Sequence, residues 1–382
     1  MRVYFNLRKG SRERMWETAK EAQKVVEVII PPIPKSNSSN IFQRNHFSIT
    51  GKIIGRLKGE IGRFLINRQK IKAIEKKIDL LYMWGSFPIN SPSPFIIELD
   101  NPYCLTYYHR NSFLKRRAKI GKELLKAKKI HFLSETARLH LFRLLEGLPQ
   151  QETLKKRAVV FYPFVDANYK KVKKRQKSPI TFLFIGLGYK RKGGRELLKA
   201  FQRVKGKNLR LIFISDITPA EREQYRDSRI EFFPPLSRRQ LLERIYPQAD
   251  VLLFPTFYES FGMVALEALS FGLGIIATNL YAMPEIVEDG VNGKLLHHPI
   301  IPPEKWNGKW IVNPVDITVQ QFYHRYLSNG EFYYSLYREL KEGIEMATDL
   351  LEEWQGRAIE RFQKRFSPTK WLETFQKSIL EE

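Results

Sequence analysis

Short apolar runs alternate regularly with helical stretches between residues 181 and 278, and this alternation constrains the fold more than any other feature of the chain. We expect strands at residues 181–185, 209–215, 230–233, 251–255 and 275–278. We expect helices between them at residues 193–204, 219–226, 237–246 and 262–270. Strands that are separated by helices form parallel sheets with right-handed crossovers. The pattern therefore predicts an α/β fold with a doubly wound parallel sheet.

The first 165 residues alternate in the same way but less regularly. Expected strands cover residues 2–7, 25–30, 78–84, 95–99, 129–133 and 159–162, and a helical pattern covers residues 12–25. The strand at 129–133 leads into a helix whose N-cap is expected at Ser134 or Thr136. A dense basic run at 170–177 is typical of a domain boundary. We predict an N-terminal domain at 1–165, a basic linker at 166–179, a C-terminal domain at 180–360 and a final helix at 361–382.

Composition excludes several classes of protein. The chain has no run of about 18 uncharged apolar residues, so it is not expected to span a bilayer. Cys104 is the single cysteine and cannot form an internal disulfide. The first residues lack the apolar core of a secretory signal, so we expect a cytoplasmic protein.

The charge balance indicates an anionic partner. Lysine and arginine outnumber aspartate and glutamate by 65 to 40, which gives a formal charge of +25. A nucleic acid, an anionic membrane surface and a phosphorylated substrate would each be attracted by such a charge. The alternative is an ordinary lysine-rich surface, and charge alone leaves these interpretations open.

The loops that follow strands are the candidate site, because ligands of open parallel sheets bind at the carboxyl ends of the strands. The loop at residues 186–194 carries Gly186, Gly188, Arg191 and Lys192. Glycines let the backbone approach a ligand, and a helix start beside two cations suits a diphosphate. The loop matches neither the dinucleotide fingerprint nor the P-loop. The alternative is a turn with an ordinary cationic surface.

A second loop, at residues 255–262, leads into a helix and brings carboxylates to the same edge of the sheet. Glu259 lies in the loop, Gly262 opens the helix and Glu267 lies within it. Backbone N–H groups at the helix start suit an anion, and the two carboxylates can accept hydrogen bonds from sugar or ribose hydroxyls. The alternatives are helix capping for Glu259 and a partly exposed helix position for Glu267. A third stretch, residues 284–296, supplies spacing rather than chemistry.

The order of these segments closely resembles the C-terminal half of GT-B retaining glycosyltransferases of family 4, the glycosyl transferases group 1. The resemblance rests on Arg191-Lys192-Gly193, on residues 249–255, on Glu259 and Glu267 with seven residues between them, and on residues 284–293. It is specific over residues 181–296 and weaker elsewhere. Leu187 stands where many members have arginine, and Arg191 is expected to supply that charge.

The resemblance implies two Rossmann-like domains that face a central cleft, with a C-terminal helix that crosses back to the N-terminal domain. The N-terminal domain would bind the acceptor, and the C-terminal domain would bind a nucleotide-sugar donor. The candidate catalytic residues are Glu259 on the sugar hydroxyls, Lys192 on the diphosphate, and Arg191. The implied donor-binding residues are Gly10, Gly186, Gly188, Ser260, Phe261, Gly262, Met263, Val264 and Glu267, the last on the ribose. His109 is a candidate contact to the donor sugar, with a structural or surface role as the alternative.

The expected chemistry is the departure of a nucleoside diphosphate, whose growing negative charge fixed cations and helix-start amides would stabilise. The chain contains no Asp-x-Asp, so neither a metal nor another cofactor is expected. Retention could proceed by two displacements or by front-face attack, in which the leaving phosphate accepts the acceptor's proton. The resemblance favours front-face attack, with Glu259 as an orienting residue.

Two basic stretches in the N-terminal half suggest contact with a membrane. Residues 52–77 hold nine basic residues against two glutamates, and residues 115–129 hold eight against one. Ile54, Leu57, Ile61 and Leu65 recur at helical spacing, which is typical of a helix in a membrane interface. The alternative is that this apolar stripe packs on the domain's own sheet.

These observations predict a peripheral, cytoplasmic, retaining hexosyltransferase. It would move a hexose-type sugar from a nucleoside-diphosphate sugar to a glycan acceptor in cell-envelope polysaccharide or glycolipid synthesis, and we expect that acceptor to be lipid-linked. Two alternatives remain. A basic nucleic-acid-binding protein would fit the charge, although a recognition motif is lacking. A GT-B epimerase or phosphorylase would fit the fold, although the spacing of the glutamates argues against it.

Overall fold

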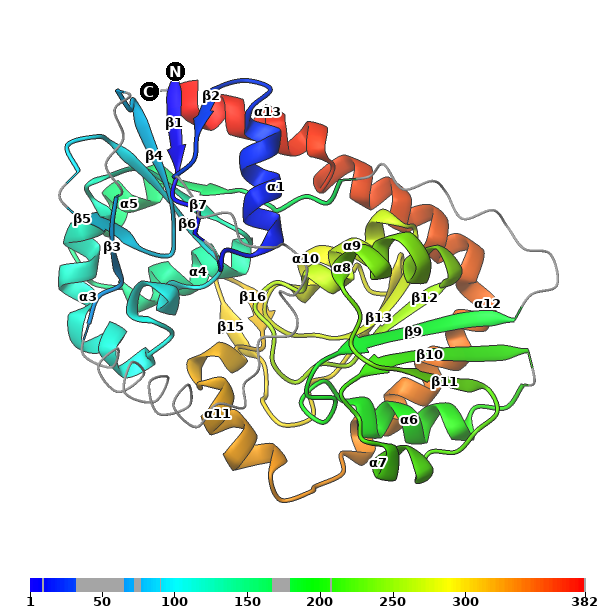
Figure 1. The fold of residues 1–382 in the computed structure, drawn as a ribbon. Helices are drawn as coiled ribbons and strands as arrows, with labels where there is room; N and C mark the ends of the chain where they lie inside the picture. The colour runs from blue at the N-terminus through cyan, green and yellow to red at the C-terminus, as the bar shows by residue number, and fades with distance from the viewer. Residues whose placement is uncertain are drawn as a thin grey trace. The chain divides into compact units, whose positions relative to one another are not determined.

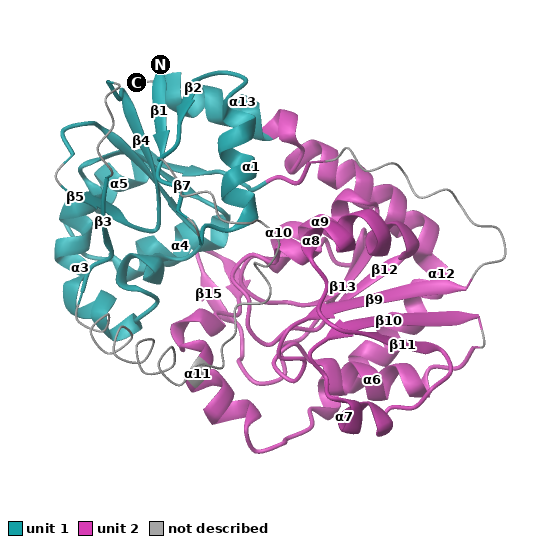
Figure 2. Ribbon diagram, viewed as in Figure 1, with its two compact units in different colours: residues 1–163, 371–382 teal, residues 164–370 magenta. Residues whose placement is uncertain are grey.

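The computed structural model describes residues 1–8, 10–31, 65–71, 77–89, 91–166, 179–206 and 208–380. The chain forms two compact units (Figure 2). Unit 1 comprises residues 1–163 and 371–382, and unit 2 comprises residues 164–370. Most of the expected linker at 166–179 and most of the expected interfacial helix at 52–77 lie outside the described residues.

Unit 1 is built on a six-stranded parallel sheet in the order β2-β1-β4-β6-β7-β8 (Figure 1). Its strands are β1 (Arg2–Phe5), β2 (Glu27–Ile29), β4 (Leu80–Trp84), β6 (Phe95–Leu99), β7 (Ala127–Phe132) and β8 (Ala158–Val160). The described helices of this unit include α1 (Glu13–Ala22), α3 (Arg110–Leu124), α4 (Glu135–Leu144) and α5 (Gln151–Arg157). Two further strands, β3 (Arg68–Lys70) and β5 (Phe87–Ile89), form a short parallel pair. The β6 strand is buried along its whole length and is apolar except for Glu98, as expected for a central strand of a sheet covered on both faces.

The N-cap of α4 is Ser134, one of the two residues expected there. Its side chain accepts a hydrogen bond from the N–H of Ala137 at 3.0 Å. This bond satisfies one of the backbone donors that every helix start leaves without a partner in the helix. The helix therefore begins shortly after β7. After α4 the chain continues through α5 and returns to the sheet as β8.

The last helix, α13 (Pro368–Leu380), completes the core of unit 1 from the far end of the chain. Phe375 is fully buried, and its ring lies 6.3 Å from that of Phe5 and 6.2 Å from that of Tyr82. Trp371 stacks on Phe375 at 4.9 Å. Residues from α13 therefore pack on side chains of β1 and β4.

A buried chain of polar groups also joins α13 to the sheet. Arg14 pairs with Glu98 at 2.8 Å, and the hydroxyl of Tyr82 donates to the same carboxylate at 2.8 Å. Because that hydroxyl proton points to Glu98, His131 Nδ1–H donates to the Tyr82 oxygen at 3.2 Å. His131 Nε2 then accepts from the Ser378 hydroxyl at 2.6 Å. Burial, together with the nearby charge of Lys129, lowers the pKa of His131 to about 3, so the ring is neutral.

Unit 2 repeats the architecture with a parallel sheet in the order β11-β10-β9-β12-β13-β14. The strands are β9 (Ile180–Gly186), β10 (Leu209–Ser215), β11 (Ile230–Phe233), β12 (Val251–Phe254), β13 (Gly274–Thr278) and β14 (Gly293–Leu296). The order reverses between β9 and β12, which are neighbours although two strands separate them in the chain. In sheets of this kind such a switch point is where ligands bind.

The helices of unit 2 are α6 (Gly194–Arg203), α7 (Pro219–Glu223), α8 (Arg238–Gln240), α9 (Met263–Ser270), α10 (Met283–Ile286), α11 (Val319–Phe322) and α12 (Tyr334–Arg365). The long helix α12 crosses the sheet (Figure 1) and buries Trp354 completely against Gly274. In the sheet, the rings of Phe184 and Phe213 stack at 4.3 Å. This dense core fixes the loops at the carboxyl ends of the strands.

The predicted fold class is confirmed, with two Rossmann-like units of parallel sheets and helices. Some details differ from the sequence expectations, among them the β3–β5 pair, which was not expected. The helix expected at 237–246 is α8, a π-helical turn at Leu241–Ile245 and a 3-10 turn at Tyr246–Gln248, because Pro247 has no N–H to continue an α-helix. A hairpin of β15 (Glu304–Trp306) and β16 (Lys309–Ile311) was not expected. Helix α12 continues past residue 360 to Arg365, and the final helix, α13, lies within the expected range 361–382.

Candidate functional site

The loops after β9 and β12 meet at the switch point of unit 2. Gly193 has a φ of +72°, and a Cβ atom built on it would lie 2.2 Å from the carbonyl oxygen of Pro255. Only glycine permits both this backbone conformation and this approach. The N–H of Phe257 also donates to the carbonyl of Arg191 at 3.0 Å. The two loops therefore form one rigid edge.

Lys192 and Glu259 form an ion pair at this edge. Lys192 Nζ lies 2.8 Å from Glu259 Oε2, and Glu259 Oε1 accepts from the N–H of Ser260 at 3.1 Å. Burial raises the pKa of Glu259, but the charge and hydrogen bond of Lys192 outweigh burial, so the pKa lies below its ordinary value. Burial also lowers the pKa of Lys192, against the attraction of Glu259. The Lys192 side chain is 10% exposed and that of Glu259 is 25% exposed, so solvent reaches the carboxylate more than the ammonium group.

Arg191 takes a different direction from Lys192. Its Nη1 donates to the carbonyl of Tyr258 at 3.1 Å, and its side chain lines a cavity that Lys192 does not reach. Burial lowers the pKa of Arg191, and the nearby charge of Glu259 opposes this effect. The side chains of these two adjacent cations therefore lie on different sides of the loop.

The glycines of the first loop have separate roles. A Cβ at Gly186 would lie 2.8 Å from Cγ of Lys192, so the absence of a side chain makes room for that lysine. The N–H of Gly188 donates to both carboxylate oxygens of Asp216, at 2.8 and 3.0 Å. Asp216 was not among the predicted site residues, although it follows the strand at 209–215 directly and its place at a strand end could have identified it.

The start of α9 contains the next group of predicted residues. Gly262 is the N-cap, with a φ of +93°, and Met263 and Val264 form the first helical positions. The N–H groups of a first turn have no partner inside the helix, and the helix dipole favours an anion there. Phe261 is buried and anchors the turn, and Ser260 supplies the N–H that binds Glu259.

Glu267 lies deeper in the structure than its neighbours. It is 4% exposed, its Oε1 accepts from Nε of Arg238, and its Oε2 accepts from the hydroxyl of Tyr246 at 2.9 Å. Both oxygens therefore have protein donors. Arg238 and Tyr246 were not predicted, because nothing in their local sequence pattern identifies a partner in a different helix.

Two predicted residues belong to the other unit. Gly10 lies in the loop after β1, and His109 occupies the N-cap position of α3 without capping it through its side chain. The structure therefore brings together the predicted residues of unit 2, while Gly10 and His109 are described within unit 1.

The region around this site is similar to a known protein family. Residues 179–306 match the family model of the glycosyl transferases group 1. They contain the Lys192–Glu259 pair, the start of α9 and Glu267. An uncharacterized 41.2 kDa protein of the cps region of Klebsiella pneumoniae is 25% identical over 285 residues, which cover 69% of this chain and 77% of that protein. D-inositol 3-phosphate glycosyltransferase of Mycolicibacterium gilvum is 41% identical over 78 residues, which cover 20% of this chain and 17% of that enzyme.

Solved structures agree with the fold over the whole chain. Anabaena HepE in complex with UDP-glucose has a TM-score of 0.60 at 14% identity, with 99% of each chain covered. WaaG, a glycosyltransferase involved in lipopolysaccharide biosynthesis, has a TM-score of 0.53 at 14% identity, with 100% of each chain covered. The fold is that of the GT-B glycosyltransferases. Together with the family match, this fold supports the interpretation that the chain is a GT-B glycosyltransferase.

Two features are absent from the residues that the structure describes. No group of three or more His, Cys, Asp or Glu side chains there could hold a metal ion. In the same ranges, every helix is too short or too polar to cross a bilayer.

Proposed function

We propose that the chain is a retaining glycosyltransferase that moves a hexose from a nucleoside-diphosphate sugar to a glycan acceptor. The observation that carries this proposal is the Lys192–Glu259 pair, at the switch point of a sheet whose residues match the glycosyl transferases group 1. A cation and a carboxylate fixed side by side suit the two ends of a sugar diphosphate. The cation would stabilise the phosphate, and the carboxylate would accept hydrogen bonds from sugar hydroxyls.

The donor diphosphate would lie against Lys192 and the first turn of α9. Negative charge grows on the β-phosphate as the sugar leaves, and both groups are already oriented to stabilise it. Because Glu259 bonds to Lys192 in this structure, a bound diphosphate would share the ammonium group with that carboxylate. The UDP-glucose complex of HepE supports a nucleoside-diphosphate hexose as the donor class.

Retention would follow from attack on the face that the diphosphate leaves. The acceptor oxygen forms a bond to the anomeric carbon while the bond from that carbon to the phosphate oxygen breaks, and the acceptor's proton passes to the departing phosphate. Neither a metal nor a covalent enzyme intermediate is required. Glu259 would orient the sugar and balance positive charge at the anomeric carbon.

The acceptor would bind unit 1 at the carboxyl end of β6. Asp100 follows this strand, and the hydroxyl of Tyr108 donates to its carboxylate at 3.3 Å, while Arg12 lies 4.0 Å away. Tyr107 and Tyr108 have φ values of 52° and 64°, which are strained for bulky residues. Such strain gathers at functional sites, where the surrounding structure holds it. Exposed tyrosines beside a carboxylate suit a sugar acceptor.

The relatives support a cell-envelope glycan as the acceptor class. One is encoded in a cps region, and WaaG and WaaB act in lipopolysaccharide synthesis or on its outer core. A lipid-linked acceptor would require a peripheral enzyme. The exposed basic residues of α3 would then contribute, since each basic residue near an anionic surface adds about 1 kcal/mol of attraction.

Transfer is tested with a panel of labelled nucleoside-diphosphate hexoses and glycan acceptors. The expected product is an elongated glycan whose new linkage keeps the anomeric configuration of the donor, as NMR would report. An inverted linkage would refute the retaining mechanism. Interconverted donor without transfer would indicate an epimerase, and phosphate-dependent glycan cleavage would indicate a phosphorylase. Activity should persist in EDTA.

Membrane contact is tested separately by flotation with vesicles. The protein should float with anionic vesicles at low salt and release at high salt. Replacing Lys115, Lys119 and Lys122 of α3 by glutamate should reduce flotation. Reversal of Lys205, Arg226 and Arg239 in unit 2 is the control of equal charge. Equal binding to neutral and anionic vesicles would contradict peripheral attachment through charge.

A further inference from the structure

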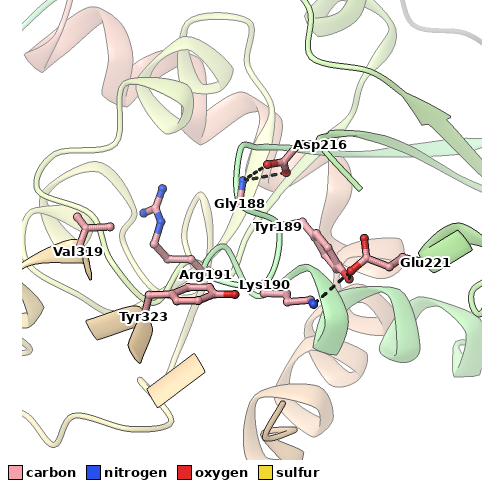
Figure 3. Close-up of a pocket in the computed structure, with 8 residues that line it drawn as sticks. All are labelled: Gly188, Tyr189, Lys190, Arg191, Asp216, Glu221, Val319 and Tyr323. Carbon is pink, nitrogen blue, oxygen red and sulfur yellow. Dashed lines mark hydrogen bonds and ion pairs between the residues drawn. The ribbon is translucent and has the colours of Figure 1, made fainter. Parts of the chain in front are cut away.

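Unit 2 contains a cavity of about 510 Å³ (Figure 3), which shares Gly188 and Arg191 with the predicted site residues. Its walls come from the loop after β9, the residue after β10, helix α7, and the segment around α11. Neither Lys192 nor Glu259 lines it. The lining side chains include Lys190, Arg191, Asp216, Glu221, Val319 and Tyr323. The volume lies within the roughly 300–1,000 Å³ that is usual for sites of small molecules.

The two carboxylates of this cavity are held in place. Glu221 caps α7 by accepting from the backbone and hydroxyl of Thr218, at 3.0 and 2.8 Å. Its other oxygen accepts from the hydroxyl of Tyr189 at 2.8 Å and lies 3.2 Å from Nζ of Lys190. Asp216 accepts from the N–H of Gly188. Polar groups that are already fixed lose little freedom when a ligand binds.

The charges of the cavity balance. Lys190 and Arg191 carry two positive charges, and Asp216 and Glu221 carry two negative ones. An anionic ligand would meet both carboxylates, and a purely apolar ligand would remove these four charged side chains from water at a cost in free energy. A neutral ligand with many hydroxyl groups can instead donate to the carboxylates and accept from the two cations.

The remaining wall is apolar and open. Tyr323 is 41% exposed and Val319 is 44% exposed, which is high for such residues. Figure 3 shows the ring of Tyr323 with its hydroxyl directed toward Lys190 and with Val319 on the opposite side. An aromatic ring beside fixed donors and acceptors suits the flat face of a sugar ring, which combines apolar C–H groups with hydroxyls at its rim.

We infer that this cavity is a binding subsite for a neutral pyranose ring. The further statement that the ring belongs to the glycan acceptor, at a position other than the reacting sugar, rests on the proposed function. Arg191 supports this link because it lines the cavity while its Nη1 holds the carbonyl of Tyr258, the residue before Glu259. A ring bound here would therefore lie against the residue that fixes the loop of the candidate catalytic carboxylate.

Binding is measured on the full chain by saturation-transfer NMR with methyl α-glucopyranoside, methyl α-galactopyranoside and methyl α-mannopyranoside. At least one should bind, and excess UDP should leave a fraction of the signal in place. Glucuronate and inorganic phosphate should bind at least fivefold more weakly in this UDP-insensitive site. The inference is overturned if none of the three neutral sugars binds, if UDP displaces all of the signal, or if the anions bind as well.

Two variants and matched controls locate the site. Tyr323→Ala should weaken the UDP-insensitive binding at least fivefold, whereas Tyr334→Ala, which removes an exposed tyrosine outside the cavity, should leave it unchanged. Asp216→Asn should make the cavity cationic and raise its affinity for glucuronate, and Asp349→Asn on the exposed face of α12 should not. Unchanged binding in Tyr323→Ala, with an unchanged melting temperature, would overturn the assignment.

Acceptor length distinguishes the source of the ring. If the ring belongs to the acceptor, Tyr323→Ala should raise KM severalfold for a long glycan and leave KM for a monosaccharide acceptor unchanged. An equal effect on both acceptors would refute the acceptor source. If the protein transfers no sugar but binds methyl hexosides in this cavity, the proposed function is refuted, whereas the inferred binding subsite is still supported.

Discussion

Lys192 Nζ and Glu259 Oε2 are 2.8 Å apart although 67 positions separate the two residues in the chain. The contact exists because β9 and β12 are neighbours in the sheet, so the loops that follow them share one edge. The lysine is nearly enclosed; burial lowers its pKa, and the carboxylate beside it opposes that effect. A phosphate that enters this edge would meet a cation whose position is already fixed.

Replacing either member of this pair should abolish transfer and keep the fold. Lys192→Ala and Glu259→Ala should each lose about 2.7–4 kcal/mol of transition-state stabilisation, which is roughly a hundredfold to a thousandfold in turnover. Lys205→Ala, an exposed lysine of the same unit, is the control. Turnover at saturating donor and the circular dichroism spectrum are the measurements. Near-full turnover in both folded variants would show that the site lies elsewhere.

The junction of the two loops predicts an unusual sensitivity at Gly193. Gly193→Ala combines a left-handed backbone with a Cβ that would lie 2.2 Å from Pro255 O. Gly290→Ala has nearly the same φ, +77° against +72°, but nothing within 4 Å of its Cβ. The control should lose about 1–2 kcal/mol from the backbone alone, and Gly193→Ala should lose clearly more, together with activity. Equal losses in urea denaturation would mean that the clash relaxes freely.

The stability of the buried Glu267 carboxylate should depend on its ion pair with Arg238. Arg238→Ala removes the cation and leaves a carboxylate that is 5% exposed, so we expect a loss of about 3–5 kcal/mol in the free energy of unfolding. The next residue provides the control, because Arg239 pairs with Glu243 on the surface, where its side chain is 83% exposed. Arg239→Ala should cost at most about 1 kcal/mol. Similar losses in the two variants would contradict a structural role of the Arg238–Glu267 pair.

The neutral state of His131 predicts an acid-sensitive stability. Its pKa is about 3 in the folded chain, against an ordinary value of 6.5. Below pH 6.5 the unfolded chain binds a proton that the folded chain does not, so stability falls as pH decreases, by up to about 1.4 kcal/mol per pH unit, until the folded pKa is reached. His131→Gln keeps polar atoms but does not titrate. Its unfolding free energy should fall less steeply between pH 6.5 and 4, with the remaining slope including His298, whose pKa is lowered by burial to about 4. An unchanged slope would refute this role.

Much of unit 2 could be predicted because its strands are short, apolar and bounded by glycine, proline or polar residues. The ranges expected at 209–215 and 230–233 are those of β10 and β11. Lys192 and Glu259 were identified separately by their positions after strands. Their ion pair could not be predicted, since it depends on the order of strands in the sheet. The buried bonds of Glu267 escaped prediction for a related reason. Arg238 lies at the start of α8, which continues as a π-helical turn. The contact between this segment and Glu267 produces no periodic pattern in the local sequence.

The membership of α13 in unit 1 has a consequence for how the chain is made. The side chains of Phe375 and Ser378 close a core whose other members lie before residue 164, so the first unit to leave the ribosome lacks part of its own interior. Translation adds roughly 5–20 residues per second, so synthesis of residues 164–370 takes on the order of ten seconds or more. During that interval the apolar side chains of β1 and β4 that pack on α13 in the folded chain are not covered by it, because α13 has not yet been synthesised. Unit 2 can fold first, and newly made chains that are still attached to the ribosome should be the form most in need of a chaperone.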